Sequence, residues 1–252
     1  KVDEPYSVDP AYGDPEYETL AAIGSNCGVS DLEAIAKGHE LCGAYSLDTI
    51  STGAAIAFAM ECFENGLLTT KDTEGIELRF GSAEAMLKTI ELIARRQSIG
   101  DILAEGTARA AQKIGKGTLE FAMQVKGLEI PMHEPRVKAA LGLGYAVNPH
   151  GADHCANLHD TMFDQPGPIL ARFNSLGILE PLPANDLGPR KVSMFWRIQQ
   201  FRIVQDSLTL CQFLPYAPDQ IIDILSAVTG WRTSTTEILS IAERTITMAR
   251  LF

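Results

Sequence analysis

The densest group of side chains able to do chemistry lies between His150 and His159, in the order His-Gly-Ala-Asp-His-Cys-Ala-Asn-Leu-His. His150 and His154 have the i, i+4 spacing of two metal ligands on one helix. Gly151 disfavours a continuous helix between them, and no third ligand is clearly placed for a zinc ion. The spacing alone therefore does not define a zinc site, and His150 and His159 are expected to be solvated.

The sequence contains five cysteines: Cys27, Cys42, Cys62, Cys155 and Cys211. They are too few and too scattered for a disulfide framework, and no pair has the C-x-x-C spacing of a zinc or redox site. Free thiols in a reducing compartment fit this pattern, which indicates a cytoplasmic protein. Cys42 and Cys62 fall on apolar helical faces and are predicted to be core residues, whereas Cys155 could belong to the core or to a site.

The composition excludes several classes of protein. The chain has 252 residues, of which 46% are hydrophobic and 21% charged, so it can bury a sizeable core. Its net charge of −11 argues against a nucleic-acid partner, because such binding depends on clustered Lys and Arg. No apolar run approaches the roughly 18 to 20 residues of a membrane span, and no signal segment opens the chain. The first residue is not Met and an apolar helical stripe runs up to Phe252, so both ends are expected to be cut.

Helical patterns dominate the first half of the sequence. Asp31 can cap a helix in which Leu32 and further apolar positions up to Cys42 share one face, and that face is expected to be buried. Residues 47–65 are small and apolar almost all round, which predicts a central helix covered on every side. Residues 82–94 and 100–114 predict two amphipathic helices.

The second half begins after a change of pattern. Residues 118–131 are β-friendly and end in proline, which predicts a short strand or loop between two halves. Proline and glycine then crowd residues 165–189, and helical patterns return at 192–213 and after Pro218 and Thr236. The predicted fold is mainly α and multihelical, with at most a short strand pair between two helical subdomains, residues 1–125 and residues 126–252.

Two hexads of similar pattern stand far apart in this sequence. The first is Gly-Ala-Tyr-Ser-Leu-Asp, from Gly43 to Asp48, and the second is Asp-Ser-Leu-Thr-Leu-Cys, from Asp206 to Cys211. Both resemble the D-x-x-G-L-(D/C) motif that the aldehyde ferredoxin oxidoreductase family carries in each of its two C-terminal domains. In that family each motif holds one of two pterins.

Three further segments agree with this resemblance, in the same order along the chain. Tyr-Glu-Thr around Glu18 precedes Asn-Cys-Gly around Cys27, Gly-Leu-Glu-Ile-Pro-Met-His ends at His133, and Gly-Ala-Asp-His ends at His154. The similarity covers essentially the whole chain. Several ordered motifs together are much more specific than any one of them.

The resemblance implies an enzyme with a tungsten or molybdenum bis-pterin cofactor, wired to a [4Fe–4S] cluster. Its substrate would be a small-molecule aldehyde and its electron acceptor ferredoxin. Glu18 would lie beside the metal and accept a proton from water or the aldehyde hydrate, and His154 would be a proton donor or a partner of the substrate oxygen. These two residues are the predicted catalytic pair.

The resemblance also implies which residues contact the cofactors. Asp48 and Asp206, with their neighbours Leu47 and Leu210, would contact the pterins, since carboxylates accept hydrogen bonds from ring N–H groups. Cys211 would be the fourth thiolate ligand of the cluster. Cys27 would be a tungsten ligand, as a thiolate is in the related benzoyl-CoA reductase branch.

Each of these roles has a purely structural alternative. Glu18 could be a first-turn acid favoured by the helix dipole. Asp48 could cap the helix that starts at Thr49. Cys211 could be a buried helix thiol and Cys27 a small core residue.

The sequence also departs from the family pattern. Gly43 stands where the first motif has an acidic or amide residue, Ser46 and Thr209 replace glycines, and Gln212 follows the cluster cysteine where an acid is usual. The upstream C-x-x-C-x-x-x-C that supplies the other three cluster ligands is missing, as is the Glu-x-x-His of a metal-bridged dimer. Both cofactors are therefore expected to be absent from this part of the protein, whose own N-terminal domain would be a partner. A homodimer stays open.

Three functions follow from this pattern. The first is part of an oxidoreductase that oxidises aldehydes to carboxylic acids with ferredoxin as acceptor. The second is a low-potential reductase of the same family, similar to benzoyl-CoA reductase. The third is a helical interaction module without catalytic activity.

Overall fold

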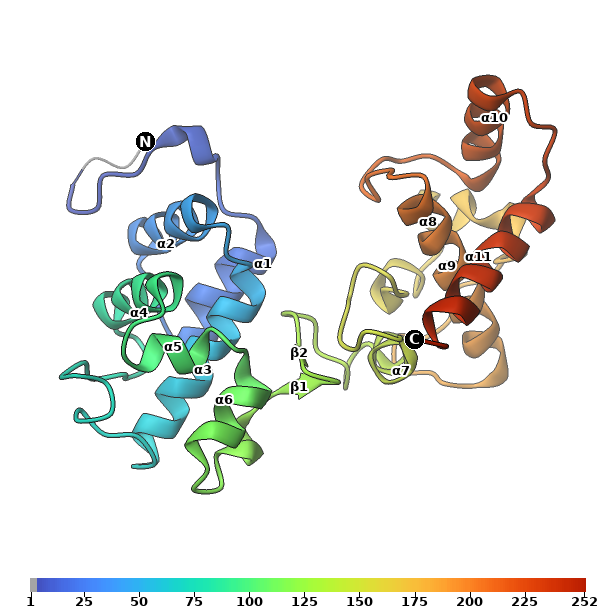
Figure 1. The fold of residues 1–252 in the computed structure, drawn as a ribbon. Helices are drawn as coiled ribbons and strands as arrows, with labels where there is room; N and C mark the ends of the chain where they lie inside the picture. Colours follow the sequence, from blue (N-terminus) through green and yellow to red (C-terminus); the bar gives the residue numbers. More distant parts are fainter. Residues whose placement is uncertain (1–3) are drawn as a thin grey trace. The chain divides into compact units, whose positions relative to one another are not determined.

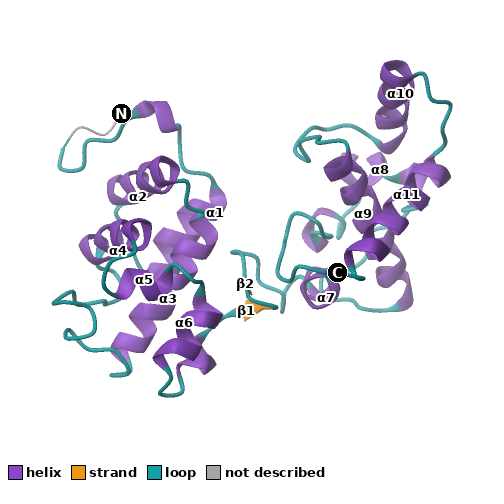
Figure 2. Cartoon of the chain, viewed as in Figure 1, coloured by secondary structure: helices purple, strands orange, loops and turns teal. Residues whose placement is uncertain are grey.

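The chain folds into two compact units, residues Lys1–Met132 (unit 1) and His133–Phe252 (unit 2), in a computed structural model that describes residues 4–252 (Figure 1). The prediction of a mainly α fold is confirmed. Within the described residues, strand structure is confined to one antiparallel pair, β1 (Gln124–Val125) and β2 (Leu128–Glu129), in which Gln124 lies opposite Glu129 (Figure 2). This hairpin belongs to unit 1, and the two units divide after it.

Unit 1 is built around one buried helix. Its helices are α1 (Tyr17–Thr19), α2 (Leu32–Tyr45), α3 (Thr49–Glu64), α4 (Ala83–Arg95), α5 (Ile99–Leu103) and α6 (Thr107–Ile114). Asp31, Asp48 and Ser82 cap α2, α3 and α4, because their side-chain oxygens accept backbone N–H groups of the first turns. The all-round apolar sequence of α3 is buried on most of its surface, as predicted.

Two local predictions in unit 1 are wrong. Leu32 is 68% exposed, because the buried face of α2 is centred on Ala34, Ile35, Gly38 and Cys42 instead. The single helix expected over 100–114 is two helices, α5 and α6. Gly106 separates them with φ +83, and the Glu129 carboxylate accepts the Thr107 N–H (2.6 Å), so a side chain from β2 caps α6.

A contact between two backbones holds α3 against the segment that follows α1. Residues Leu20–Gly24 form one π-helical turn. A Cβ atom at Gly53 would lie 2.5 Å from both the carbonyl carbon and the oxygen of Ala22. Only glycine fits this crossing, which places the chain just after Glu18 directly on α3.

Unit 2 packs its helices around α9. They are α7 (Ala139–Val147), α8 (Pro168–Arg172), α9 (Pro189–Ser207), α10 (Pro218–Thr229) and α11 (Thr235–Ala249). The helix predicted over 192–213 begins earlier, with Pro189 in its first turn, and ends at Ser207. In the core, the Phe173 ring packs at a tilt against Phe163 and edge-to-face against Phe201, with ring centroids 5.4 and 5.3 Å apart, respectively.

A buried ion pair joins α9 to the start of α7. The side chains of Lys191 and Asp160 are both 0% exposed, and Lys191 Nζ lies 2.9 Å from Asp160 Oδ1. The Asp160 carboxylate also accepts the N–H groups of Ala140 (3.3 Å) and Leu141 (3.0 Å), and Lys191 donates to the Leu182 carbonyl. Both charges are therefore compensated inside the core by a partner that lies far away in the sequence.

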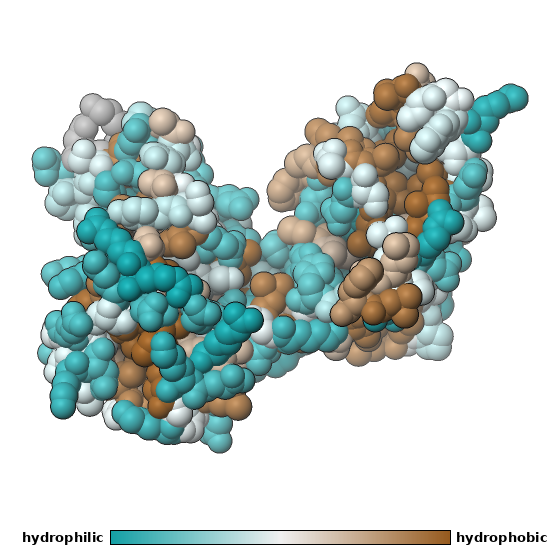
Figure 3. All heavy atoms as spheres, viewed as in Figure 1, coloured by the Kyte–Doolittle hydropathy of each residue, from teal (hydrophilic) through white to brown (hydrophobic). Residues whose placement is uncertain are grey.

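Within residues 4–252, no helix is both long and apolar enough to cross a membrane. Large apolar side chains are nonetheless exposed in the last part of unit 2, and brown atoms gather there in Figure 3. They include Phe213, Val228, Trp231, Leu251 and Phe252.

Candidate functional site

The two hexads fold into the same helix-ending turn. At the end of α2, the Leu47 N–H donates to the Cys42 carbonyl (2.8 Å) and the Ser46 N–H to the Gly43 carbonyl (3.2 Å). At the end of α9, the Leu210 N–H donates to Gln205 (2.9 Å) and the Thr209 N–H to Asp206 (3.0 Å). Both pairs of bonds are those of a Schellman motif, in which the residue after the helix is left-handed. The same helix-ending turn is thus present in both units.

The left-handed residue of each turn is not glycine. Ser46 has φ +57 and Thr209 has φ +53. These are the two positions at which the family motif has glycine. The turn explains this preference for glycine, since a residue without Cβ adopts the left-handed conformation most easily. The sequence differs from the motif here while the backbone keeps the turn.

The leucines and the acid of the first hexad have local structural partners. Leu47 and Leu210 are half-buried and pack against the cores of unit 1 and unit 2, respectively. Asp48 caps α3, since its Oδ2 accepts the Ser51 N–H at 2.7 Å. The capping role considered for Asp48 is therefore present, and its role toward a pterin stays a prediction.

The second hexad lies beside the loop that carries His154. The pKa of the Asp206 carboxyl is raised, first because the group is partly removed from water and second by the nearby Asp153 carboxylate. Arg202 and His150 act in the opposite direction. The fold thus brings together two sequence-predicted segments of unit 2, the hexad from Asp206 and the histidine loop.

The histidine loop is irregular and held by its own aspartate. Asp153 Oδ1 accepts the Cys155 N–H (2.7 Å), and Asp153 Oδ2 lies 2.8 Å from His150 Nε2. His154 Nε2 lies 3.3 Å from Cys155 Sγ. Ligand atoms of Asp153, His154 and Cys155 fall within 4.8 Å of one another, so these three residues offer one oxygen, one nitrogen and one sulfur donor to a metal ion.

His133 packs against His154 and His159 of this loop in a cluster of three histidines, which the sequence did not suggest. The ring of His133 lies 5.0 Å from that of His154 and 4.7 Å from that of His159. Lys138 Nζ contacts His133 Nδ1 at 2.9 Å. His133 closes a family-like segment, but nothing in its spacing predicted this contact.

The expectation that His159 is solvated is wrong. Its pKa is lowered to about 3, first by burial and then by His133, Lys138 and His154. The neutral ring donates from Nε2 to the His154 carbonyl (3.0 Å). His159 therefore supports the backbone of the residue with the predicted proton role, whereas His150 is exposed as expected.

Glu18 lies in α1 and is buried. Its Oε2 accepts the Met132 N–H at 2.9 Å, and the neighbouring Tyr17 hydroxyl donates to the Met132 carbonyl at 2.6 Å. Two adjacent side chains thus hold both backbone polar groups of Met132, at the end of unit 1. A buried carboxylate in the first turn of a helix fits both interpretations of Glu18 from the sequence.

The two cysteines expected to bind metals have opposite surroundings. Cys27 is fully buried, its thiol faces the carbonyls of Ala22 (3.5 Å) and Gly53 (3.6 Å), and burial raises its pKa to about 12. Cys211 is exposed just beyond the second Schellman turn, so the alternative of a buried helix thiol is wrong. The ligand roles of both residues stay predictions. Cys42 and Cys62 are buried, as predicted for core residues.

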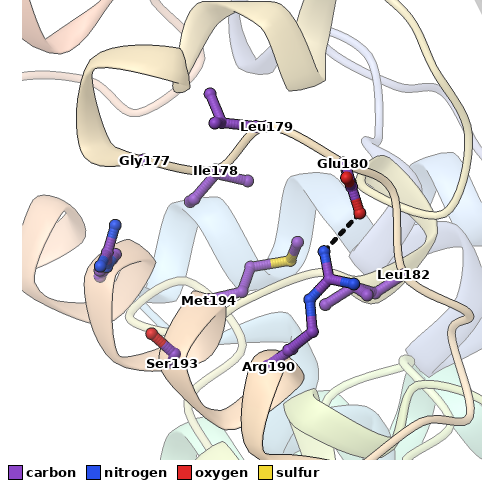
Figure 4. A pocket seen from close by; sticks show the side chains of 9 residues that line it. Gly177, Ile178, Leu179, Glu180, Leu182, Arg190, Ser193 and Met194 are labelled. Atoms are coloured by element: carbon purple, nitrogen blue, oxygen red, sulfur yellow. Dashed lines mark hydrogen bonds and ion pairs between the residues drawn. The ribbon is translucent and has the colours of Figure 1, made fainter.

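A separate cavity of about 240 Å³ opens between the first turns of α9 and the loop before it (Figure 4). Arg190, Ser193 and Met194 line it from the helix, and Leu179 and Glu180 line it from the loop. Arg190 is ion-paired with Glu180, as the dashed line in Figure 4 shows. None of the residues predicted from the sequence lines this cavity.

The two hexads, the segment of Glu18 and the histidine loop are the parts of the sequence on which its resemblance to a pterin-dependent oxidoreductase rests. The chain belongs to the aldehyde ferredoxin oxidoreductase family, because the family model for domains 2 and 3 matches residues 1–252. Tungsten-containing aldehyde ferredoxin oxidoreductases of Thermococcus kodakarensis and Pyrococcus horikoshii are 37% and 36% identical over 241 and 243 residues, respectively. Each alignment covers 94% of this chain and 38% of the relative, so the chain spans well under half of their length.

Two further proteins show how broad this similarity is. The WOR-like subunit of an aliphatic sulfonate oxidoreductase from Pyrococcus furiosus is 38% identical over 146 residues, which is 56% of this chain and 23% of that protein. The active-site complex BamBC of benzoyl coenzyme A reductase, solved with 1,5-dienoyl-CoA, superposes with a TM-score of 0.68 at 21% identity. The superposition covers 94% of this chain and 41% of that one, and at this identity it establishes the shared fold.

Proposed function

We propose that this chain is part of a tungsten- or molybdenum-pterin oxidoreductase that oxidises aldehydes to carboxylic acids and passes the electrons to ferredoxin. The observation that carries the proposal is the pair of hexads, which form the same Schellman turn in both units. A short motif can match by chance. Two copies with one backbone conformation, in a chain of this family, support a common task for both copies.

The described residues fit this cofactor set unequally. At the second hexad, Asp206 offers a carboxyl that can accept hydrogen bonds from a pterin ring edge, and the exposed Cys211 thiol is available as a cluster ligand. At the first hexad, Asp48 is already engaged with the start of α3 and Gly43 offers no side chain. The bis-pterin metal would supply the two-electron redox chemistry, and the remaining cluster ligands would come from the protein's own N-terminal domain.

The residues of this chain would transfer protons during the reaction. Oxidation of an aldehyde with water gives a carboxylic acid, two electrons and two protons. Glu18, oriented by the Met132 N–H, would take one proton from water or the aldehyde hydrate. His154, whose carbonyl is held by His159, would donate to or hold the substrate oxygen.

The test is a comparison of variants in the full-length protein. Glu18→Gln should lower the turnover of aldehydes by about 10²- to 10⁴-fold, which is the usual size of a general acid–base contribution, and should leave metal and pterin content unchanged. Glu16→Gln is the matched control, because Glu16 is exposed two residues earlier. Absence of both tungsten and molybdenum from the purified protein would contradict the proposal.

The second candidate is a low-potential reductase in which Cys27 binds the metal. In that case Cys27→Ala should abolish the spectroscopic signals of the metal site. A Cys27→Ala protein with full metal content and activity would rule this candidate out. The enclosed position of the thiol between the Ala22 and Gly53 carbonyls is the reason for placing it second.

A further inference from the structure

An aromatic ring lies against the first hexad at the position where the second hexad carries its acid. Gly43 and Asp206 are equivalent in the two Schellman turns, since each accepts the N–H of the left-handed residue. A Cβ atom at Gly43 would lie 2.8 Å from Cδ1 and 3.4 Å from Cε1 of Tyr12. No larger residue fits at position 43 unless the Tyr12 ring moves.

Contacts with α2 hold the backbone of the segment that carries this ring. Tyr12 ends a 3₁₀ turn (Pro10–Tyr12) that Asp9 caps by accepting the Ala11 N–H. The Tyr12 carbonyl accepts a hydrogen bond from His39 Nε2 (3.0 Å), and the Asp9 N–H donates to Glu40 Oε2 (2.9 Å). His39 lies one helical turn before Gly43, so the segment follows the face of α2 on which Gly43 lies.

The ring remains accessible from the other side. Tyr12 is 41% exposed, although its segment is held at three backbone groups. An exposed, positioned aromatic ring can stack on a flat heterocycle, a contact that carboxylates cannot make. The two hexads therefore present different chemistry, an aromatic surface in unit 1 and a carboxyl group in unit 2.

We propose that Tyr12 is a specificity-determining residue, which replaces the acid of the first hexad and contacts one flat heterocycle through its ring. The identity of that heterocycle as a pterin rests on the proposed function. The pairing of Tyr12 with Gly43 does not, because it follows from the packing of unit 1 alone. Tyr12 and Gly43 act as one unit, in which the absence of a side chain at 43 makes room for the ring at 12.

The first experiment tests the pairing without any cofactor. Gly43→Ala, Tyr12→Ala and the double variant are unfolded in urea, and unfolding is followed by far-UV circular dichroism. Alanine is the better helix former, so Gly43→Ala should lower the equilibrium constant of unfolding by about threefold when Tyr12 is replaced by Ala. It should give no stabilisation when Tyr12 is present. The same gain in both backgrounds would overturn the pairing. Tyr45→Ala, at the same helix end, is the control and should be additive with Gly43→Ala.

The second experiment tests the contact with the heterocycle in the full-length protein. Pterin released on denaturation is measured by fluorescence, after dilution and a fixed period of dialysis. Tyr12→Ala should lose pterin at least tenfold faster than the wild type, and Tyr12→Phe should retain it. Equal retention in Tyr12→Ala would overturn the stacking role. If the wild-type protein contains no pterin while the Tyr12–Gly43 coupling is present, the proposed function fails and the pairing stands.

Discussion

The buried ion pair between Lys191 and Asp160 gives the most demanding test of unit 2. In Lys191→Met, the aliphatic stem keeps its packing and the charge is removed. Asp160 then remains buried as an anion with the N–H groups of Ala140 and Leu141 as its remaining partners. Breaking a buried pair by removing one partner costs about 3–5 kcal/mol, a range that includes the lost bond from Lys191 to the Leu182 carbonyl. We therefore expect a loss of about 4 kcal/mol, a large part of the 5–15 kcal/mol typical of a domain.

Tryptophan fluorescence in urea measures this loss in unit 2 alone, because both tryptophans, Trp196 and Trp231, lie there. With a slope of about 1.5 kcal/mol per M, the urea midpoint should fall by about 2.7 M. Arg190→Met removes the neighbouring exposed pair with Glu180 and should leave the midpoint unchanged. A fall of less than about 1 kcal/mol in Lys191→Met would refute the reasoning, since it would mean that water reaches the pair.

The remaining predictions concern single positions. Thr209→Gly and Ser46→Gly should each raise the unfolding free energy by about 1 kcal/mol in urea titrations, because glycine removes the strain of a positive φ. The gain should be larger at Thr209, which is β-branched. A loss of stability at both positions would contradict the turn geometry. The pKa of His159 is about 3 in the folded state and about 6.5 in the unfolded state, so its contribution to stability is complete above pH 6.5 and is lost as the pH falls toward 3. The unfolding free energy of unit 2 should therefore fall by about 2 kcal/mol between pH 7 and pH 5. His159→Gln should remove that part of the pH dependence. Iodoacetamide on the native chain should label Cys211 and spare Cys27, whose thiol is buried, as peptide mass spectrometry will show; rapid labelling of Cys27 would mean that unit 1 opens.

Features set by neighbouring residues could be read from the sequence. Asp31 and Asp48 cap their helices through N–H groups two or three residues away, so local pattern was enough to predict them. The all-round apolar pattern of α3 likewise required burial on every side. The fold class followed from such local patterns.

Features that depend on distant partners could not be read in this way. Asp160 and Lys191 are 31 residues apart, and each residue type is usually exposed, so only the folded core reveals their pairing. The break at Gly106 had a local signal, yet Glu129 of the hairpin decides where α6 begins. Of the predicted site, the structure brings the hexad from Asp206 beside the His154 loop, while the chemical roles of Glu18, His154 and Cys211 stay predictions.

The close contact between Gly53 and the Ala22 backbone limits how the sequence of unit 1 can evolve. Contacts between side chains can change in evolution, because a smaller residue on one helix can be compensated by a larger residue on its neighbour. Two backbones in direct contact offer no such exchange, since the Ala22 carbonyl cannot become smaller. A saturation library of unit 1 should therefore accept many residues along α3 and none but glycine at position 53. The chain that leads out of Glu18 would then be among the slowest parts of the molecule to diverge.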